Sequence, residues 1–176
     1  MSSFPFHDPM KRITWLAGPP GAGKSTLAAT HRRDGHRMDE FNAMLQPLVE
    51  PVRMRQGILG AHDMLIPLIR HLERHPGNTH LPPLLVVAGL VTEDALFPLG
   101  QDEAVLLLLP DRDRWLEQLH RRPVVDAHPP QYDDYAYSEA WYDRLASWPA
   151  KGYPVRVIDT PFMPELLGQI AEENDA

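Results

Sequence analysis

The hydrophobic positions of the chain fall into short runs that are separated by longer polar segments. Two of these runs, 81–90 and 104–110, are almost purely apolar, which is typical of strands that are buried on both faces of a sheet. Three weaker β-rich runs predict further strands at 12–17, 36–38 and 153–159.

Helical periodicity appears between these strands. Segment 111–122 has acids at its start, arginines at its end and an apolar face that consists of Trp115, Leu116 and Leu119. Segment 138–148 carries an aromatic stripe at helical spacing, which we interpret as core packing: Trp141, Leu145 and Trp148. Three other helices are expected at 25–33, 93–98 and 164–173.

Proline is unusually frequent, with 19 residues in a chain of 176, against roughly 5% in average usage. Pro47, Pro51 and Pro67 interrupt the periodic segment 41–75, so we expect two or three short helices there instead of one long helix. Strands that alternate with helices predict an α/β fold with a parallel sheet covered on both faces. The length favours a single domain over 1–176, with a flexible lead-in at 1–11.

The composition of the chain argues against several kinds of catalytic and binding site. The chain has no cysteine, which excludes disulfides, thiolate catalysis and cysteine zinc sites. No apolar stretch approaches the ~20 residues of a membrane span, and the first residues lack the apolar core of a signal peptide, so we expect no membrane partner and a cytoplasmic location. The net charge of −7 argues against broad, non-specific nucleic-acid binding but leaves room for a local basic cleft.

The strongest motif lies directly after the first predicted strand, where GPPGAGKS at 18–25 fits G-x-x-x-x-G-K-[ST]. Glycines let successive backbone N–H groups turn toward a β-phosphate, and the helix that follows adds its positive N-terminus. Lys24 is expected to reach the β- and γ-phosphate oxygens, and the Ser25 hydroxyl to ligate Mg²⁺. The sequence therefore predicts a nucleoside triphosphate site formed by Gly18, Pro19, Pro20, Gly21, Ala22, Gly23, Lys24, Ser25 and Thr26.

Residues 13–28 resemble the P-loop NTPases, and the order of elements along the whole chain resembles the small nucleoside and nucleotide kinases. The resemblance implies a three-layer P-loop fold with a mostly parallel central sheet and a short lid segment, and it implies ATP and Mg²⁺ as cofactors. Other branches fit less well, because the chain has no N-K-x-D or D-x-x-G motif of a GTPase and no LSGGQ-like signature. It is also short for an AAA+ module.

The resemblance implies roles for two groups outside the loop. In small kinases an acid after the second strand faces the acceptor hydroxyl as a general base or serves Mg²⁺, and here that acid is Asp39, with Glu40 as the second candidate. The alternative for Asp39 is the N-cap of a helix that begins near Phe41.

Arginines at the lid are the other group. Arg121 and Arg122 are expected to clamp the transferring phosphoryl group, with Arg112 and Arg114 nearby, because a planar guanidinium can follow the migrating charge. The alternative is a solvated helix face. The expected lid is the loop 123–137, whose Asp126, His128, Asp133 and Asp134 either meet an acceptor or belong to an ordinary polar loop.

One departure from the kinase pattern concerns the second-shell ligand of Mg²⁺. A Walker B aspartate is expected at the end of strand 81–90, but the residue there is Gly89, and Glu93 and Asp94 come later. This departure favours a metal role for Asp39. His71 and His75 share a helix face, but HLERH lacks the glutamate of H-E-x-x-H, so we interpret them as surface residues.

The expected function is transfer of the γ-phosphoryl group of ATP to an acceptor hydroxyl, with segment 41–75 and its Arg53 and Arg55 as the acceptor pocket. Such arginines suit an anionic acceptor, a nucleotide or DNA. The motif order resembles the phage kinases of 5-hydroxymethyluracil in DNA and the polynucleotide 5′-hydroxyl kinases, which would place the protein in a host cytoplasm. The alternatives are a kinase of a small metabolite, sugar or antibiotic, and a switch ATPase without acceptor. The loop at 159–161 is expected to border the adenine.

Overall fold

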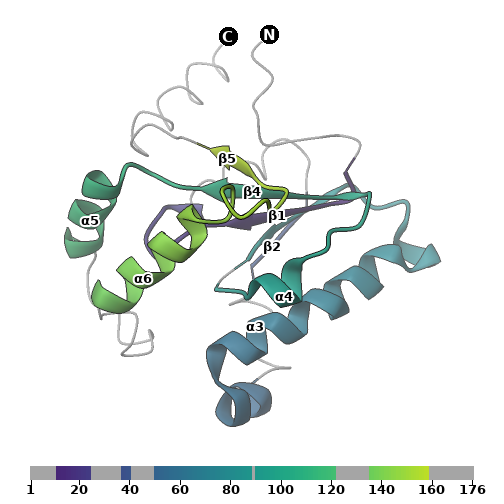
Figure 1. Cartoon of the computed structure of the whole chain (residues 1–176). Helices are drawn as coiled ribbons and strands as arrows, with labels where there is room; N and C mark the ends of the chain where they lie inside the picture. The colour runs from purple at the N-terminus through teal and green to yellow at the C-terminus, as the bar shows by residue number, and fades with distance from the viewer. Residues whose placement is uncertain (1–10, 25–36, 41–49, 89, 122–134, 159–176) are drawn as a thin grey trace, which may run out of the picture.

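The computed structural model describes residues 11–24, 37–40, 50–88, 90–121 and 135–158, and these residues form a sheet of five parallel strands (Figure 1). The spatial order is β2-β3-β1-β4-β5. All five strands that the sequence predicts are present: β1 (Ile13–Ala17), β2 (Arg37–Glu40), β3 (Leu84–Val87), β4 (Glu103–Leu108) and β5 (Arg156–Ile158).

Nearly every residue of the central strands β1, β3 and β4 is buried, so the sheet is covered on both of its faces. On one face Trp15, Val86 and Leu107 join a single hydrophobic core and are 0% exposed. The neighbouring positions Leu16 and Leu106 lie outside that cluster and are also buried, at 0% and 5% exposure. Because successive strand residues point to opposite faces, the sheet is the middle layer of an α/β fold, as the sequence predicts.

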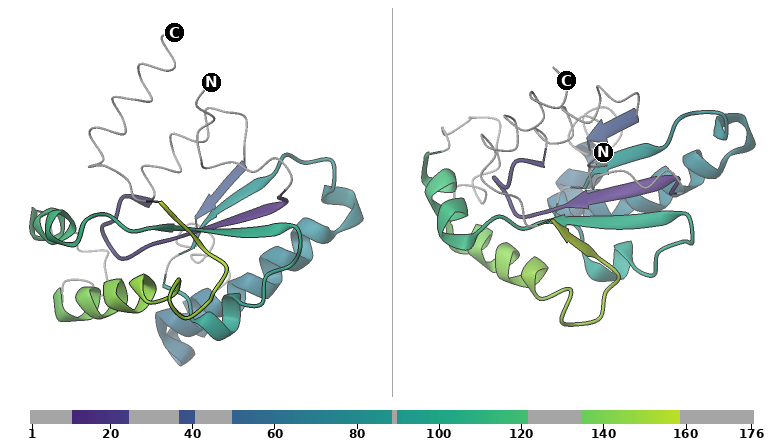
Figure 2. Two further views of the ribbon diagram at one scale, coloured as in Figure 1. Left: turned by 45° about the horizontal axis from the view of Figure 1, so that its top comes forward. Right: turned by 90° about the horizontal axis from the view of Figure 1, so that it is seen from above.

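Helices α3, α4 and α6 pack on one face of the sheet, and α5 lies beyond the carboxyl ends of β1 and β4 (Figures 1 and 2). Their bounds are α3 (Glu50–Arg74), α4 (Glu93–Leu96), α5 (Arg112–Arg121) and α6 (Tyr135–Ala146), and a 3₁₀ turn, η2 (Pro76–Asn78), follows α3. None of the described helices is long and apolar enough to cross a membrane.

The expectation of several short helices in 41–75 is wrong for the described part, since α3 is one helix of 25 residues with Pro67 inside it. A proline in a helix interior costs about 3 kcal/mol. Against this cost, α3 buries Leu65, Ile66 and Ile69, all at 2% exposure or less, and each such side chain contributes roughly 1.5–3 kcal/mol. Packing against the sheet therefore outweighs the local penalty.

The helix expected at 138–148 is displaced at both ends. It begins at Tyr135, so the last residues of the expected loop 123–137 are helical, and it ends at Ala146. The aromatic stripe is core, as predicted, with Trp141 at 6% and Trp148 at 0% exposure. Residues 122–134 lie outside the described residues, as do the expected helices at 25–33 and 164–173.

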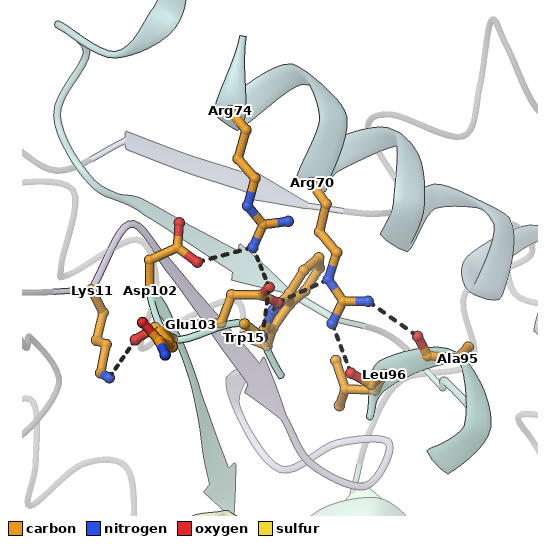
Figure 3. A network of polar contacts seen from close by, with 10 residues as sticks. Lys11, Trp15, Arg70, Arg74, Ala95, Leu96, Asp102 and Glu103 are labelled. Carbon is orange, nitrogen blue, oxygen red and sulfur yellow. Dashed lines mark hydrogen bonds and ion pairs between the residues drawn. The ribbon is translucent and has the colours of Figure 1, made fainter. Parts of the chain in front are cut away.

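A network of charges fixes α3 to the amino end of the sheet (Figure 3). The buried carboxylate of Glu103, at the start of β4, accepts hydrogen bonds from the Trp15 indole at 2.8 Å and from Arg70 Nε at 2.9 Å. Arg74 pairs with Glu103 and, at 2.9 Å, with Asp102. Burial raises the pKa of Glu103, but the hydrogen bonds from Trp15, Arg74 and Arg70 outweigh it, so the pKa lies below its ordinary value.

Candidate active site

The glycine-rich loop begins directly after β1 and turns at the carboxyl edge of the sheet. Two of its glycines adopt positive φ, Gly21 at 75° and Gly23 at 91°. Ala22 N–H donates to the Pro19 carbonyl at 3.2 Å and closes the turn between them. These backbone conformations are the ones that glycine adopts without strain, so the sequence motif and the loop geometry agree.

Gly18 marks a close approach of two backbone segments. A Cβ atom at this position would lie 2.8 Å from the Leu108 carbonyl oxygen and 3.4 Å from Lys24 Cδ. The loop is therefore seated against the end of β4 on one side and against the lysine stem on the other. Only a residue without a side chain allows the loop backbone to approach β4 this closely.

Lys24 is directed back onto its own loop. Its Nζ donates to the Gly18 carbonyl at 2.7 Å and to the Pro19 carbonyl at 3.0 Å. Two neutral carbonyls of the loop thus bind the ammonium. Anionic phosphate oxygens form stronger hydrogen bonds with an ammonium than carbonyls do, so a polyphosphate in the loop would compete well for it. Ser25 and Thr26, the expected hydroxyl pair, lie outside the described residues.

Helix α5 forms the wall behind the loop. Trp115 is completely buried, and its indole Nε1–H donates to the Pro20 carbonyl at 2.7 Å. One turn later, Leu119 Cδ1 lies 3.3 Å from the point where a Cβ of Gly21 would be. Sequence periodicity assigns both residues to the buried face of the helix. It carries no signal for the loop contact, which joins positions 95 residues apart.

The arginines of α5 differ in their surroundings. Arg112 pairs with Glu139 and Asp143 of α6, both at 3.4 Å, and lies over the Tyr142 ring, so it fastens α5 to α6. Arg114 is exposed. For Arg121, the last residue of α5, the structure describes only the backbone, and Arg122 lies outside the described residues.

Asp39 reaches the same edge of the sheet as the loop. It pairs in register with Val86 of β3, and Val86 pairs with Trp15 of β1, two residues before the end of that strand. Because β2 lies two strands from β1, the Asp39 backbone is on the order of 10 Å from the Trp15 backbone, and the loop begins three residues after Trp15. The structure describes only the backbone of Asp39 and Glu40, both within β2, and the expected helix cap near Phe41 lies outside the described residues.

Two carboxylates near the end of β3, those of Asp63 and Glu93, are engaged in structural contacts, while Asp94 is exposed. Asp63 of α3 accepts from the Thr92 backbone N–H at 2.9 Å and from the Thr92 hydroxyl at 2.8 Å. Glu93 accepts two hydrogen bonds from Arg144 and one from the Trp148 indole at 2.7 Å. The Arg144 guanidinium is the largest cause that lowers the pKa of Glu93 to about 2. Glu93 is thus committed to α6 and does not fold back toward the loop.

The two histidines singled out in the sequence, His71 and His75, are exposed, as predicted. His75 precedes η2, and its Nδ1 accepts from the Gly77 backbone N–H at 3.1 Å. The side chains of Arg53 and Arg55, the expected acceptor contacts, and residues 159–161 are not among the described parts of the chain.

No protein-family model matches the chain, and no curated protein matches its sequence. Its fold is similar to that of shikimate kinase from Bacteroides thetaiotaomicron, with a TM-score of 0.59 at 13% identity over 93% of this chain and 96% of that one. Shikimate kinase from Acinetobacter baumannii, in complex with shikimate, gives 0.57 at 15% identity over 94% and 96%. The tunicamycin resistance protein of Deinococcus radiodurans gives 0.52 at 20% identity over 93% and 95%. The chain therefore has the fold of the small P-loop kinases.

Proposed function

We propose that this protein is an ATP-dependent kinase that transfers the γ-phosphoryl group to an acceptor hydroxyl. The observation that carries the proposal is the loop of residues 18–24, seated by Gly18 and closed by its positive-φ glycines at the carboxyl edge of the sheet. In α/β sheets of this kind ligands bind at that edge. The similarity of the fold to small kinases over nearly the whole chain supports the same activity.

In this proposal each residue has a defined task. Lys24 leaves the carbonyls of Gly18 and Pro19 to hold the β- and γ-phosphate oxygens of ATP. Ser25 ligates Mg²⁺, which when bound neutralises charge on the phosphates. Asp39 orients or deprotonates the acceptor hydroxyl and contributes to the metal site, and Arg121 or Arg122 stabilises the charge of the transferring group. We place this reaction in the cytoplasm, where ATP is available.

The acceptor that we put first is a hydroxyl of a nucleoside, nucleotide or DNA base such as 5-hydroxymethyluracil. A hydroxylated small metabolite, sugar or antibiotic is the second candidate. Fold neighbours favour the second: they include the shikimate kinase in complex with shikimate and a sugar kinase from Janibacter sp. HTCC2649, which has a TM-score of 0.50 at 16% identity over 93% of this chain and 92% of that one. The match covers more than 90% of this chain and of each of these two neighbours.

The deciding experiment incubates the protein with γ-labelled ATP, Mg²⁺ and a panel of acceptors. The panel contains nucleosides, nucleotides, plain DNA, 5-hydroxymethyluracil DNA, sugars and shikimate. Label on one acceptor that disappears in Lys24→Ala, and persists in the surface control Lys151→Ala, supports the kinase and names its substrate class. Label that appears only as free phosphate across a broad panel favours a switch ATPase. Full transfer by Lys24→Ala contradicts the proposed role of the loop.

A further inference from the structure

The turn between Pro19 and Ala22 has a defined type. Its closing hydrogen bond runs from Ala22 N–H to the Pro19 carbonyl at 3.2 Å, so Pro20 and Gly21 are its central residues. Gly21 has a φ of 75°, and the ring of Pro20 fixes the φ of that residue near −65°. A negative φ followed by a positive φ defines a type II turn.

The sequence Pro-Gly alone does not select this turn. A type I turn places proline at the same position and closes with the same hydrogen bond. The two types differ by a flip of the peptide between Pro20 and Gly21, which reverses the directions of the Pro20 carbonyl and the Gly21 N–H. A hydrogen bond to that peptide can therefore stabilise one turn type over the other.

Trp115 makes that contact. Its indole N–H donates to the Pro20 carbonyl at 2.7 Å from a fully buried position. The ring is itself held, since it packs against Tyr142 at a centroid distance of 4.8 Å and Tyr142 O–H donates to the Pro110 carbonyl at 2.6 Å. A flip of the peptide would turn the Pro20 oxygen away from the indole. The hydrogen bond between these two buried polar groups, the indole N–H and the Pro20 carbonyl, would then be lost.

The direction of the carbonyl sets the direction of the next amide. The peptide between Pro20 and Gly21 is trans, so its N–H points opposite to its carbonyl and therefore away from Trp115 and α5. Pro19 and Pro20 have no N–H, which makes Gly21 the first residue after Gly18 that can offer a backbone donor to an anion. In a loop that binds phosphate with backbone donors, the orientation of this amide matters.

We propose that Trp115 is a positioning residue of the nucleotide site, which holds the loop in the type II turn and so directs the Gly21 N–H toward the phosphates. The proposal rests on the nucleotide binding put forward above and adds to it a residue of α5, far from the motif in sequence. Trp115 does not touch the reacting atoms in this proposal. It holds the loop in the binding conformation before ATP binds.

The test is Trp115→Phe, which keeps an aromatic ring in the core and removes the donor. The matched control is Trp148→Phe, which also loses an indole hydrogen bond of 2.7 Å, to Glu93. We expect the dissociation constant for Mg·ATP to rise about tenfold in Trp115→Phe, the effect of one lost hydrogen bond, and to stay unchanged in Trp148→Phe. At saturating ATP the turn is forced into place, so kcat should change far less than KM.

Indole NMR of the wild-type protein keeps the proposal falsifiable if Trp115→Phe does not fold. The other three tryptophans are assigned with their own Phe variants, and Trp115 by elimination. Addition of Mg·ADP should slow solvent exchange of the Trp115 indole N–H and leave that of Trp148 unchanged. Equal nucleotide affinity in wild type and a folded Trp115→Phe, or unchanged exchange at Trp115 on ADP binding, overturns this inference alone. A wild-type protein that does not bind Mg·ATP overturns the proposed function as well.

Discussion

Gly18 packs so tightly against the Leu108 carbonyl that its missing side chain is a structural requirement. In Gly18→Ala the new Cβ would lie 2.8 Å from that backbone oxygen, which cannot rotate away as a side chain could. The loop would have to shift off β4. We therefore expect Gly18→Ala to lose at least about tenfold in Mg·ATP affinity, measured by calorimetry, because a displacement of the loop misaligns several donors together.

Gly152 offers the matched control for this glycine. Its φ is 83°, and a Cβ there would meet nothing within 4 Å, so Gly152→Ala introduces backbone strain without a collision. Both variants should melt at lower temperature than the wild type, but only Gly18→Ala should bind nucleotide more weakly. Wild-type affinity in Gly18→Ala would mean that the loop does not need its seat on β4.

At the scale of single residues, the sequence predicts features of the site that depend on neighbouring residues. It does not predict contacts between residues that are far apart in the chain. The turn at the glycines was predictable, because a turn conformation depends on neighbours within a few positions, while the contacts of the glycines and Lys24 with phosphate stay predictions. Trp115 was assigned correctly to a buried helix face, yet its bond to Pro20 joins residues that only the folded sheet brings together. Glu93 was considered for the metal site, and its pairing with Arg144 of α6 was equally beyond a local pattern.

At the scale of elements, Pro67 shows why a proline count predicts helices poorly. The rule estimates the local free-energy cost of a missing backbone N–H, whereas α3 is stabilised by burial of Leu65, Ile66 and Ile69 in the core. The strands were predicted well, since buried parallel strands require continuous apolar runs that the sequence displays. Helix ends were predicted less well: α6 begins three residues before the expected Ser138.

The cost of Pro67 predicts a stabilising substitution. Pro67 is exposed inside α3, so Pro67→Ala should restore the hydrogen bond to the Asp63 carbonyl without opening a cavity. We expect a gain of about 1–3 kcal/mol in the free energy of unfolding, measured from urea midpoints. Pro51→Ala is the control, because Pro51 lies in the first turn, where the N–H has no helical partner, and should change little. A loss of stability in Pro67→Ala would show that the ring itself packs favourably.

Glu93 connects α4 to α6, and its pKa makes this connection dependent on pH. The pKa falls from 4.5 to about 2 in the folded protein, with the Arg144 hydrogen bonds as the largest cause. A carboxyl whose pKa is lowered by folding stabilises the fold above its unfolded pKa, and this stabilisation is lost as the pH falls toward the folded pKa. The contact should therefore be at full strength above about pH 5 and weaken progressively between about pH 4.5 and pH 2.

Glu93→Gln isolates this effect from the other acids of the protein. The stability difference between wild type and variant, from urea unfolding at a series of pH values, should be constant near neutrality and shrink below pH 4.5. Arg144 is 38% exposed, so added salt should also reduce the difference. A difference that does not vary with pH would mean that the charge of Glu93 contributes nothing to the contact between α4 and α6.

At the scale of the whole molecule, the amino ends and the carboxyl ends of the parallel strands have different roles. The Glu103 network secures the amino edge through Trp15, Arg70 and Arg74, while the loop, the end of β2 and α5 meet at the carboxyl edge. Parallel strands make this division possible, since every strand begins at one edge and ends at the other. A ligand at the carboxyl edge would thus bind to a fold that the Glu103 network already stabilises at the opposite edge.

Because only the folded chain assembles the carboxyl edge, nucleotide binding should raise the melting temperature. At a Mg·ATP concentration of 100 times the dissociation constant, the stabilisation is about 2.7 kcal/mol. For a domain of this size that corresponds to roughly 5–10 °C. Lys24→Ala should lose most of the shift, because the ammonium that leaves the Gly18 and Pro19 carbonyls for phosphate is gone. Lys151→Ala, at an exposed position far along the chain, should retain it. An equal shift in both variants would mean that the nucleotide binds elsewhere than in the loop.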